Sequence, residues 1–409
     1  MADIRGTLEW QNLVGRDAEG LNTLYKLSAL TLLTYASRYP SLRFGRTYRT
    51  LVHSIRAFEN VSRSLLSLPS NIGFEELLRR RLMKRKHYYY GTYLAVLSSL
   101  PILWSVMKQE DLISPVLAKT AEIVSIKTLD NINDVYHTRS QALRSLDTQF
   151  EAFTQECFNT PPARGYIHRA ENSAYRLARL TYRLTSSSTD ADSPIYRMYI
   201  DDLKTYMRGQ KESMRQKEMS SDKIDIRTFL IEVNEKGVGN VWVDVDFCFL
   251  DGHHALTEEE LEEVELIKKA IDLIFKGCNV YDDIADLHTD ISEGILNSVC
   301  YLALDRGHCS ESDLTRDPST LVRRLERSGA FEEAVELGDL LFLKGIETLK
   351  EAKKRNRVVD IDALVFNANV LRIFAIRKWL ISSPSLKKAI SVSCPKFSES
   401  LAEYYRYIR

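Results

Sequence analysis

The sequence predicts an all-α fold, and three observations lead to this fold class. Apolar residues recur every three or four positions over long segments, which is the spacing of one helix face. Alternation of apolar and polar residues, the sign of a strand, is scarce. Short runs rich in Gly, Pro, Ser and Asp separate the periodic segments, and none has the length of an interdomain linker. We therefore expect one domain over residues 1–409, with the helices of residues 1–75 either integral or accessory.

The expected helices follow from these periodic segments. They are residues 23–37, 74–100, 112–155, 166–185, 195–219, 258–304, 319–354 and 361–382. The segment 258–304 has the clearest start, because Thr257 can cap the helix and glutamates fill its first turns. The most apolar run, "YYYGTYLAVLSSLPILWSVM", contains Gly91 and Pro101, so we interpret it as a core helix and expect no transmembrane segment.

Composition restricts the partners and the compartment. Lys and Arg together number 56, as do Asp and Glu, so net charge gives no argument for nucleic acid or an acidic membrane as a partner. The six cysteines are scattered without a CxxC pair, which is typical of buried thiols in a reducing compartment. The N-terminal residues lack the apolar core of a secretory signal. We expect a cytoplasmic protein that does not bind nucleic acid.

The segment "NVYDDIADLHTDISEGILN" concentrates negative charge. Asp282, Asp286 and Asp290 are spaced four residues apart and form one stripe on a helix, and no Lys or Arg occurs between Lys276 and Arg306. Like charges at this spacing destabilise a helix by a few tenths of a kcal/mol per pair. One interpretation is a solvated acidic surface. The other is a cation site, in which these carboxylates bind Mg²⁺ and the metal binds a phosphate.

A second acidic motif occurs in "LDNIND". Asp130, Asn131 and Asp134 share one face of an otherwise apolar predicted helix, and buried carboxylates need partners. Alone this motif is weak, but two acidic motifs on separate core helices form a more specific pattern. We interpret the nearby His137 and His288 as satisfied side chains, because Mg²⁺ prefers oxygen ligands.

Together these motifs resemble the class I isoprenoid synthases, which include trans-prenyl diphosphate synthases and terpene cyclases. "DDIAD" with the following "DISEGILN" is similar to the family's second acidic motif, "LDNIND" is similar to the first motif of the large class IB terpene synthases, and residues 76–97 resemble a segment of that branch. The resemblance implies a helical bundle around a central active-site cavity. It also implies three Mg²⁺ ions, held by Asp130, Asn131, Asp134, Asp282, Asp286 and Asp290, among which Asp130, Asp134, Asp282 and Asp286 are the catalytic residues.

Basic residues could bind the diphosphate of the substrate. Lys204, Arg208, Lys211 and Arg215 lie on one predicted helix face, and spacing alone favours a solvated face over a binding site. Resemblance favours binding, because Gly209–Gln210 is similar to the glycine-glutamine of prenyl synthases. Arg227 stands where the family usually has lysine, and arginine can bind phosphate through two hydrogen bonds. The "GVG" of residues 237–239 should break a helix.

Departures from chain-elongating enzymes favour cyclisation. Asn131 replaces an aspartate of the first motif, and Cys278–Asn279 replaces the phenylalanine-glutamine before the second motif. The basic motif that binds isopentenyl diphosphate is matched only in part, by "FGRTYRT" at 44–50. The resemblance then implies a terpene synthase that ionises a prenyl diphosphate of C15 or longer and cyclises the cation or removes a proton from it. The alternatives are a trans-prenyl diphosphate synthase and an all-α scaffold without activity. The oligomeric state stays open, and a homodimer is one option.

Overall fold

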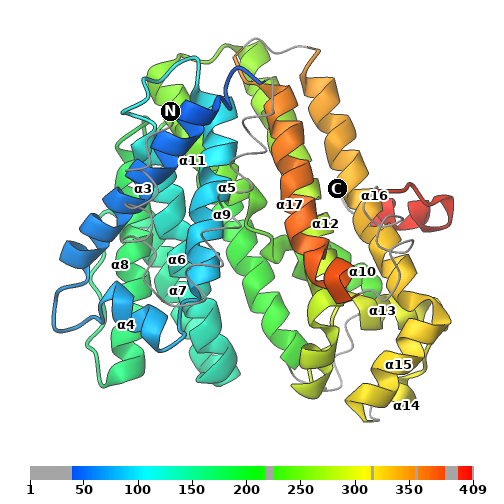
Figure 1. Cartoon of the computed structure of the whole chain (residues 1–409). Helices are drawn as coiled ribbons and strands as arrows, with labels where there is room; N and C mark the ends of the chain where they lie inside the picture. The colour runs from blue at the N-terminus through cyan, green and yellow to red at the C-terminus, as the bar shows by residue number, and fades with distance from the viewer. Residues whose placement is uncertain (1–38, 218–224, 315–316, 355–357, 383–394, 408–409) are drawn as a thin grey trace, which may run out of the picture. The chain divides into compact units, whose positions relative to one another are not determined.

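The computed structural model describes residues 39–217, 225–314, 317–354, 358–382 and 395–407, and Figure 1 shows their helices. Throughout these ranges the chain is helical and contains no strand, which confirms the all-α prediction. The helix predicted at 23–37 lies outside the described residues.

The described residues form two compact units. The first comprises residues 39–197, 245–255 and 358–364, and the second comprises residues 198–217, 225–244, 256–314, 317–354, 365–382 and 395–407. That residues 1–409 form one domain stays a prediction.

The first unit is organised around one buried helix. Its helices are α3 (Phe44–Leu65), α4 (Phe74–Arg79), α5 (Arg85–Leu103), α6 (Ile113–Val135), α7 (Arg139–Thr154) and α8 (Tyr166–Ser186). α6 packs against α3, α5, α7 and α8, which explains why it is apolar around most of its circumference. α5 is buried over most of its length, as expected of a core helix. No helix in the described ranges is long and apolar enough to span a membrane.

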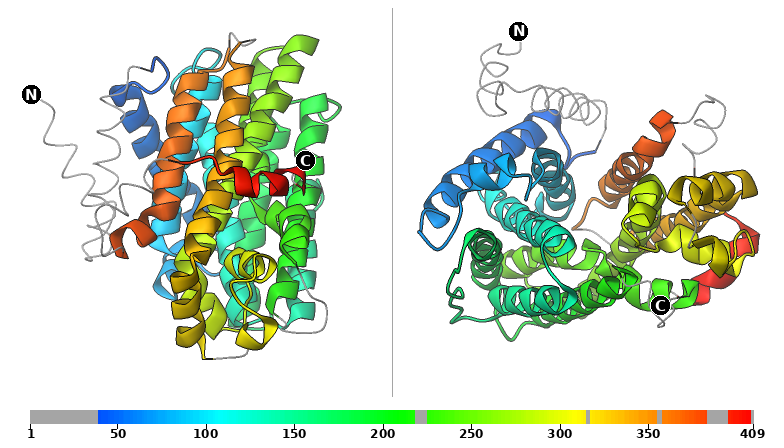
Figure 2. Two further views of the ribbon diagram at one scale, coloured as in Figure 1. Left: turned by 90° about the vertical axis from the view of Figure 1, so that its right-hand side faces the viewer. Right: turned by 90° about the horizontal axis from the view of Figure 1, so that it is seen from below.

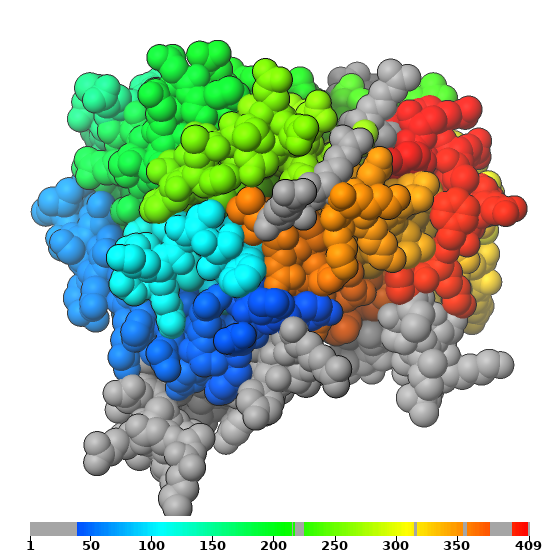
Figure 3. All heavy atoms as spheres, turned by 90° about the horizontal axis from the view of Figure 1, so that it is seen from above, coloured from blue at the N-terminus to red at the C-terminus, as the bar shows by residue number. Residues whose placement is uncertain are grey.

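The second unit is built on the pair α12 (Glu258–Ser292) and α16 (Ala330–Ala352), which run side by side in Figure 2. Its shorter elements are η1 (Met214–Lys217), α10 (Ile226–Thr228), η2 (Phe229–Val233), η3 (Asn234–Lys236), α13 (Ser298–Asp305), α14 (Glu311–Leu314), α15 (Pro318–Ser328) and η4 (Glu399–Tyr407). Figure 3 shows η4, in red, against the orange surface of α16. Three helices contribute residues to both units: α9 (Pro194–Ser213), α11 (Gly239–His253) and α17 (Ile361–Ser382).

Helix boundaries differ from the prediction where local chemistry interrupts the periodic pattern. The segment predicted at 112–155 divides into α6 and α7, because Thr138 caps α7 through a reciprocal capping box with Gln141. A second capping box, between Thr257 and Glu260, begins α12 and confirms the predicted start. The break predicted at 237–239 is also confirmed, since η3 ends at Lys236 and α11 begins at Gly239.

Five of the six cysteines lie in the described ranges, and four of these five fit the expectation of buried thiols. Cys248, Cys278, Cys300 and Cys309 are buried and free, whereas Cys157 is exposed.

A charged cluster lies wholly inside the first unit. The Lys119 ammonium donates hydrogen bonds to Ser98 Oγ (2.6 Å), to Ser99 Oγ (3.3 Å) and to the Asp246 carboxylate. One helical turn further along α6, the Glu122 carboxyl is 0% exposed, and neither of its oxygens has a hydrogen-bond partner among the residues that the structure describes. Burial raises the pKa of Glu122 to about 8, although the charge of Lys119 lowers it. Glu122 is therefore a neutral acid in the folded protein at pH 7.

The variant Glu122→Gln should flatten the dependence of stability on pH. An unfolded glutamate loses its proton near pH 4.5, and folded Glu122 loses it near 8. The stabilising contribution of the bound proton is complete below the unfolded value and is lost as the pH rises through about 8. Urea unfolding at pH 5, 6.5 and 8 measures the free energy of unfolding of both proteins. As the pH rises, this free energy should fall in the wild type relative to Glu122→Gln by up to about 1.4 kcal/mol per pH unit. Parallel curves for the two proteins, like those expected for the exposed control Glu151→Gln, would contradict this assignment.

Candidate metal and diphosphate site

The second acidic motif occupies the last turns of α12. Asp282 is exposed, Asp286 and Asp290 are partly buried, and the apolar residues Ile284, Leu287 and Ile291 are buried against the rest of the second unit. In the described ranges, no Lys or Arg forms an ion pair with Asp282 or Asp290. The predicted stripe of carboxylates therefore lies along one helix, and in the part of the chain that the structure describes no direct salt bridge neutralises Asp282 or Asp290.

The end of α12 fixes one of these carboxylates in place. Gly294 has a positive φ of 75°, a backbone conformation that favours glycine, and the chain turns there into α13. Asn297 caps α13 by accepting a hydrogen bond from the Val299 N–H (3.1 Å). The Asn297 amide also donates to Asp290 Oδ2 (2.8 Å) and to the Asp283 carbonyl (2.9 Å). The "DISEGILN" segment is thus a turn that immobilises Asp290.

Burial and neighbouring charge both act on this end of α12. Burial, reinforced by the charges of Asp283 and Asp286, raises the pKa of Asp290 to about 7, while the hydrogen bond from Asn297 lowers it. The charges of Asp283 and Asp286 beside Asp290 make this end of α12 a region of negative potential. A bound cation would relieve this potential.

Asp283 has a different position from its neighbours. Its Oδ2 accepts a hydrogen bond from the Ser298 N–H (2.9 Å) at the start of α13. Burial raises the pKa of Asp283, and the charge of Lys236 and the hydrogen bonds with Ser298 lower it. Asp283 therefore holds α13 against α12.

Lys236 is a basic residue that the sequence did not single out. Its charge lowers the pKa of both Asp283 and Asp290, so it lies within electrostatic range of the acidic end of α12. Lys236 ends η3, directly after a π-helical turn at Phe229–Val233. The helix break thus brings a cation to the acidic motif, and no sequence spacing indicates this.

Gly209 explains how α9 can pack against this break. A Cβ atom at Gly209 would lie 2.3 Å from the Lys236 backbone nitrogen and 2.4 Å from the Glu235 carbonyl carbon, so only glycine fits. The neighbouring Gln210 is buried, and its amide donates to the Tyr206 hydroxyl (3.0 Å). Gly209 thus allows α9 to lie directly against the segment that carries Lys236.

The predicted basic face of α9 is largely solvated. Lys204 is exposed and forms an ion pair with Asp201 (2.8 Å), and Arg208 is exposed. Lys211 is partly buried, and the side chain of Arg215 lies outside the described residues. Arg227, in α10, is exposed; it stacks on the Tyr407 ring (4.6 Å) and donates to its hydroxyl (2.9 Å). Their assignment to diphosphate binding stays a prediction.

The first acidic motif lies in the last two turns of α6, in the first unit. Asp130 is partly buried and forms an ion pair with Lys127 (3.0 Å), and Asp134 is exposed. The Asn131 amide nitrogen donates to the Leu82 carbonyl (2.8 Å). This bond orients the amide and leaves its carbonyl oxygen without a hydrogen bond in the described part of the chain. That oxygen is a hard ligand of the kind that Mg²⁺ prefers.

The donor atoms of both motifs fit Mg²⁺. Within the described residues, no three His, Cys, Asp or Glu side chains converge closely enough to hold a metal by themselves. Mg²⁺ does not require such a cluster, because it keeps several waters and binds through one or two carboxylates together with substrate phosphates. In the second unit the carboxylates around Asp290, and in the first unit the Asn131 oxygen, are each donors that suit a metal arriving with a phosphorylated ligand.

A basic cavity of about 700 Å³ lies between α4 and the start of α5, in the first unit. Its charged lining residues are Glu75, Glu76, Arg79, Arg81, Lys84 and Arg85. Arg79 pairs with Glu76, and Arg85 lies 3.7 Å from Glu75. Arg81 and Lys84 are exposed and form no ion pair in the described ranges. The sequence did not indicate this cavity, since it depends on the turn at Arg81, whose φ is 59°.

The other basic candidate, in "FGRTYRT", lies in the first two turns of α3. Arg46 lies over the Trp104 ring, at 6.0 Å from its centroid, and Arg49 is exposed.

Comparisons with known proteins add the following. No family model matches the chain, and no curated protein matches it. A solved structure, the geranylgeranyl pyrophosphate synthetase from the archaeon Geoglobus acetivorans, is similar in fold with a TM-score of 0.43 and 16% sequence identity, over 73% of this chain and 96% of that chain.

Proposed function

We propose that the protein is a Mg²⁺-dependent class I terpene synthase. Its substrate would be a prenyl diphosphate of C15 or longer, from which diphosphate departs, and the allylic cation then cyclises or loses a proton. The metal-binding residues would be Asp130, Asn131 and Asp134 in the first unit and Asp282, Asp286 and Asp290 in the second.

The acidic end of α12 carries this proposal. A solvated acidic surface would leave its carboxyls exposed and would need no supporting structure. Here Asp290 is buried enough to raise its pKa to about 7, is held by Asn297, and lies in the field of Lys236. Keeping carboxyls close together in a partly buried position destabilises the fold, so an arrangement that fixes them there favours a binding role.

The chemistry follows from the charges. Bound Mg²⁺ would neutralise the negative charge that develops on the departing diphosphate. Asp282, Asp286 and Asp290 supply oxygen ligands along one face of α12, and Asn297 keeps Asp290 in one orientation. In the second unit, Lys236 is better placed than Arg227 to attract diphosphate to these carboxylates, because its charge acts on Asp283 and Asp290.

A thermal-shift titration tests the proposal against an inactive scaffold. Mg²⁺ and inorganic diphosphate together should stabilise the fold by about 2.7 kcal/mol at ligand concentrations 100-fold above Kd, because they bind only the folded state. Mg²⁺ alone or diphosphate alone should stabilise the fold much less, because each ligand forms part of the binding site of the other. An unchanged melting temperature with both ligands would sink the catalytic proposal and favour the scaffold. Asp201→Asn, which removes an exposed carboxylate of α9, is the matched control and should respond as wild type does.

Chain elongation is the second candidate function, and the basic cavity favours it. An elongating enzyme needs a second basic site for the diphosphate of isopentenyl diphosphate, and Arg81 and Lys84 could supply one. The paired Arg79 and Arg85 contribute less, because glutamates neutralise them. We keep elongation as the alternative, because Asn131 stands where elongating enzymes carry a second aspartate.

A further inference from the structure

The end of α6 combines features that should destabilise a helix. Asp130 and Asp134 lie in its last two turns, where the helix dipole disfavours negative charge, and no basic residue occurs in the last turn. Lys127 compensates Asp130 in part. The helix nevertheless continues to Val135, so contacts with other elements must hold its end in place.

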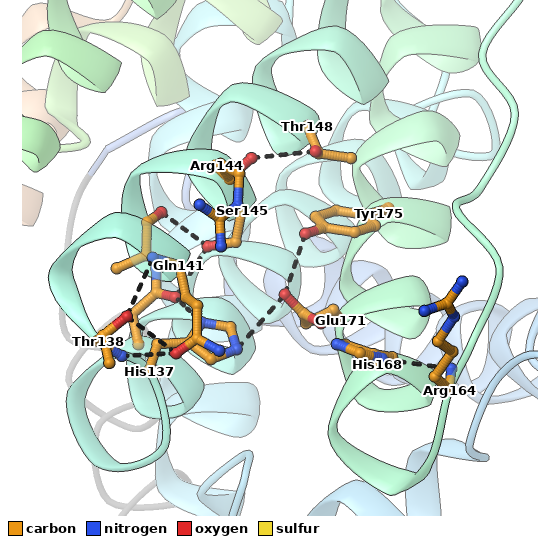
Figure 4. A network of polar contacts seen from close by, with 12 residues as sticks. His137, Thr138, Gln141, Arg144, Ser145, Thr148, Arg164, His168, Glu171 and Tyr175 are labelled. Carbon is orange, nitrogen blue, oxygen red and sulfur yellow. Dashed lines mark hydrogen bonds and ion pairs between the residues drawn. The ribbon is translucent and has the colours of Figure 1, made fainter.

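Four side chains provide these contacts, and three of them, His137, Ser145 and Glu171, are labelled in Figure 4. The Asn133 amide oxygen accepts a hydrogen bond from Ser145 Oγ of α7 (2.8 Å) and lies 2.8 Å from His137 Nδ1. An amide oxygen can only accept, so His137 donates from Nδ1. His137 Nε2 lies 3.6 Å from Glu171 Oε1 of α8. We call Asn133, His137, Ser145 and Glu171 the α6 anchor.

The anchor is buried and connects three helices. Asn133 is 2% exposed, Ser145 is 3% exposed and Glu171 is 8% exposed. Asn133 follows Asn131 by two residues and precedes Asp134 by one, so the contacts of its side chain restrain the backbone that carries both. From this geometry we propose that the α6 anchor positions Asp130, Asn131 and Asp134 for metal binding. The inference rests on the proposed function, in which these residues bind Mg²⁺ with diphosphate.

Loss of the anchor should weaken metal binding, because the end of α6 is then ordered in a smaller fraction of the molecules. When only a fraction of molecules has the competent conformation, the apparent Kd rises by the inverse of that fraction. If the end of α6 is ordered in a tenth of the molecules, the Kd rises about tenfold. None of the four anchor residues needs to touch the metal.

The same helix offers a matched control. Ser125 is buried in α6, donates to the Ala174 carbonyl of α8 (2.8 Å) and accepts from Gln149 of α7 (2.9 Å). It links the same three helices as the anchor but lies about two turns before the acidic residues. A purely structural role for the anchor would give Ser125→Ala and Ser145→Ala the same effects.

The experiment compares Ser145→Ala, Ser145→Thr and Ser125→Ala in the full chain. Isothermal titration with Mn²⁺ in the presence of inorganic diphosphate gives the metal affinity, and amide hydrogen exchange reports the order of residues 130–136. We expect Ser145→Ala to weaken Mn²⁺ binding about 3- to 10-fold and to speed exchange at 130–136, as the population argument requires. Ser145→Thr keeps the hydroxyl, so it should bind Mn²⁺ with wild-type affinity and show wild-type hydrogen exchange at residues 130–136. Ser125→Ala should lower the melting temperature with wild-type metal affinity.

Two results would overturn the inference. One is unchanged Mn²⁺ affinity in Ser145→Ala, and the other is equal weakening in Ser145→Ala and Ser125→Ala. A wild-type protein that binds no Mn²⁺ with diphosphate would instead overturn the proposed function, and the inference with it. The wild-type titration therefore distinguishes the two failures.

Discussion

Replacing Asp286 with asparagine should abolish most turnover without weakening the fold. Asp286 lies between Asp282 and Asp290 on the acidic face of α12, so the substitution removes one proposed metal ligand and one of three like charges. Loss of one charge-stabilising group at a transition state typically lowers kcat about 10²–10³-fold. Relief of repulsion should leave the free energy of unfolding equal to that of wild type or a few tenths of a kcal/mol higher. Steady-state kinetics with prenyl diphosphates and urea unfolding measure the two effects.

Asp283→Ala is the informative comparison, because the neighbouring carboxylate has a structural contact. Asp283 accepts a hydrogen bond from the Ser298 N–H at the start of α13, and removing it leaves that donor without its partner. The expected cost is about 1–3 kcal/mol of stability. The kcat of Asp283→Ala should fall less than the kcat of Asp286→Asn at temperatures where both variants are folded. Equal losses of kcat in both variants at full folding would show that the metal-binding face has been assigned wrongly.

The contrast between Asp286 and Asp283 shows which features of the site can be predicted from the sequence. The four-residue spacing of Asp282, Asp286 and Asp290 is a property of one helix, so it was predictable. Local chemistry was equally accessible, as the capping box at Thr257 confirms. The contact of Asp283 with Ser298 depends on the turn at Gly294, which is a tertiary feature.

Long-range contacts account for the features that the sequence did not indicate. Lys236 reaches the field of Asp290 only because a π-helical turn and a 3-10 turn redirect the chain before Gly237. The ion pair between Lys204 and Asp201 was accessible in principle, because the two residues are three apart on a helix. It supports the solvated interpretation of the α9 face, which spacing alone had favoured.

Labelled isopentenyl diphosphate should not be incorporated into product with any allylic partner. A cyclase needs a single diphosphate site, and the acidic end of α12 with Lys236 is our candidate for it. An elongating enzyme needs a second, and the structure offers two basic candidates: the Arg81–Lys84 cavity and the Arg46–Arg49 turn of α3. We expect wild type to convert one prenyl diphosphate of C15 or longer into a hydrocarbon or alcohol that extracts into hexane without phosphatase treatment.

Matched alanine variants locate the diphosphate site in the same assay. Arg81→Ala with Lys84→Ala, and Arg46→Ala with Arg49→Ala, should each leave turnover within a few-fold of wild type, because neither pair touches the single substrate of a cyclase. Lys236→Ala should lower kcat about 10²-fold, since a positive charge close to the carboxylates is lost from the transition state. Arg227→Ala tests the sequence-based assignment of the diphosphate sensor, and a loss as large as that of Lys236→Ala would uphold it. Incorporation of isopentenyl label that disappears in the Arg81–Lys84 double variant would instead identify a chain-elongating enzyme with its second diphosphate in the basic cavity.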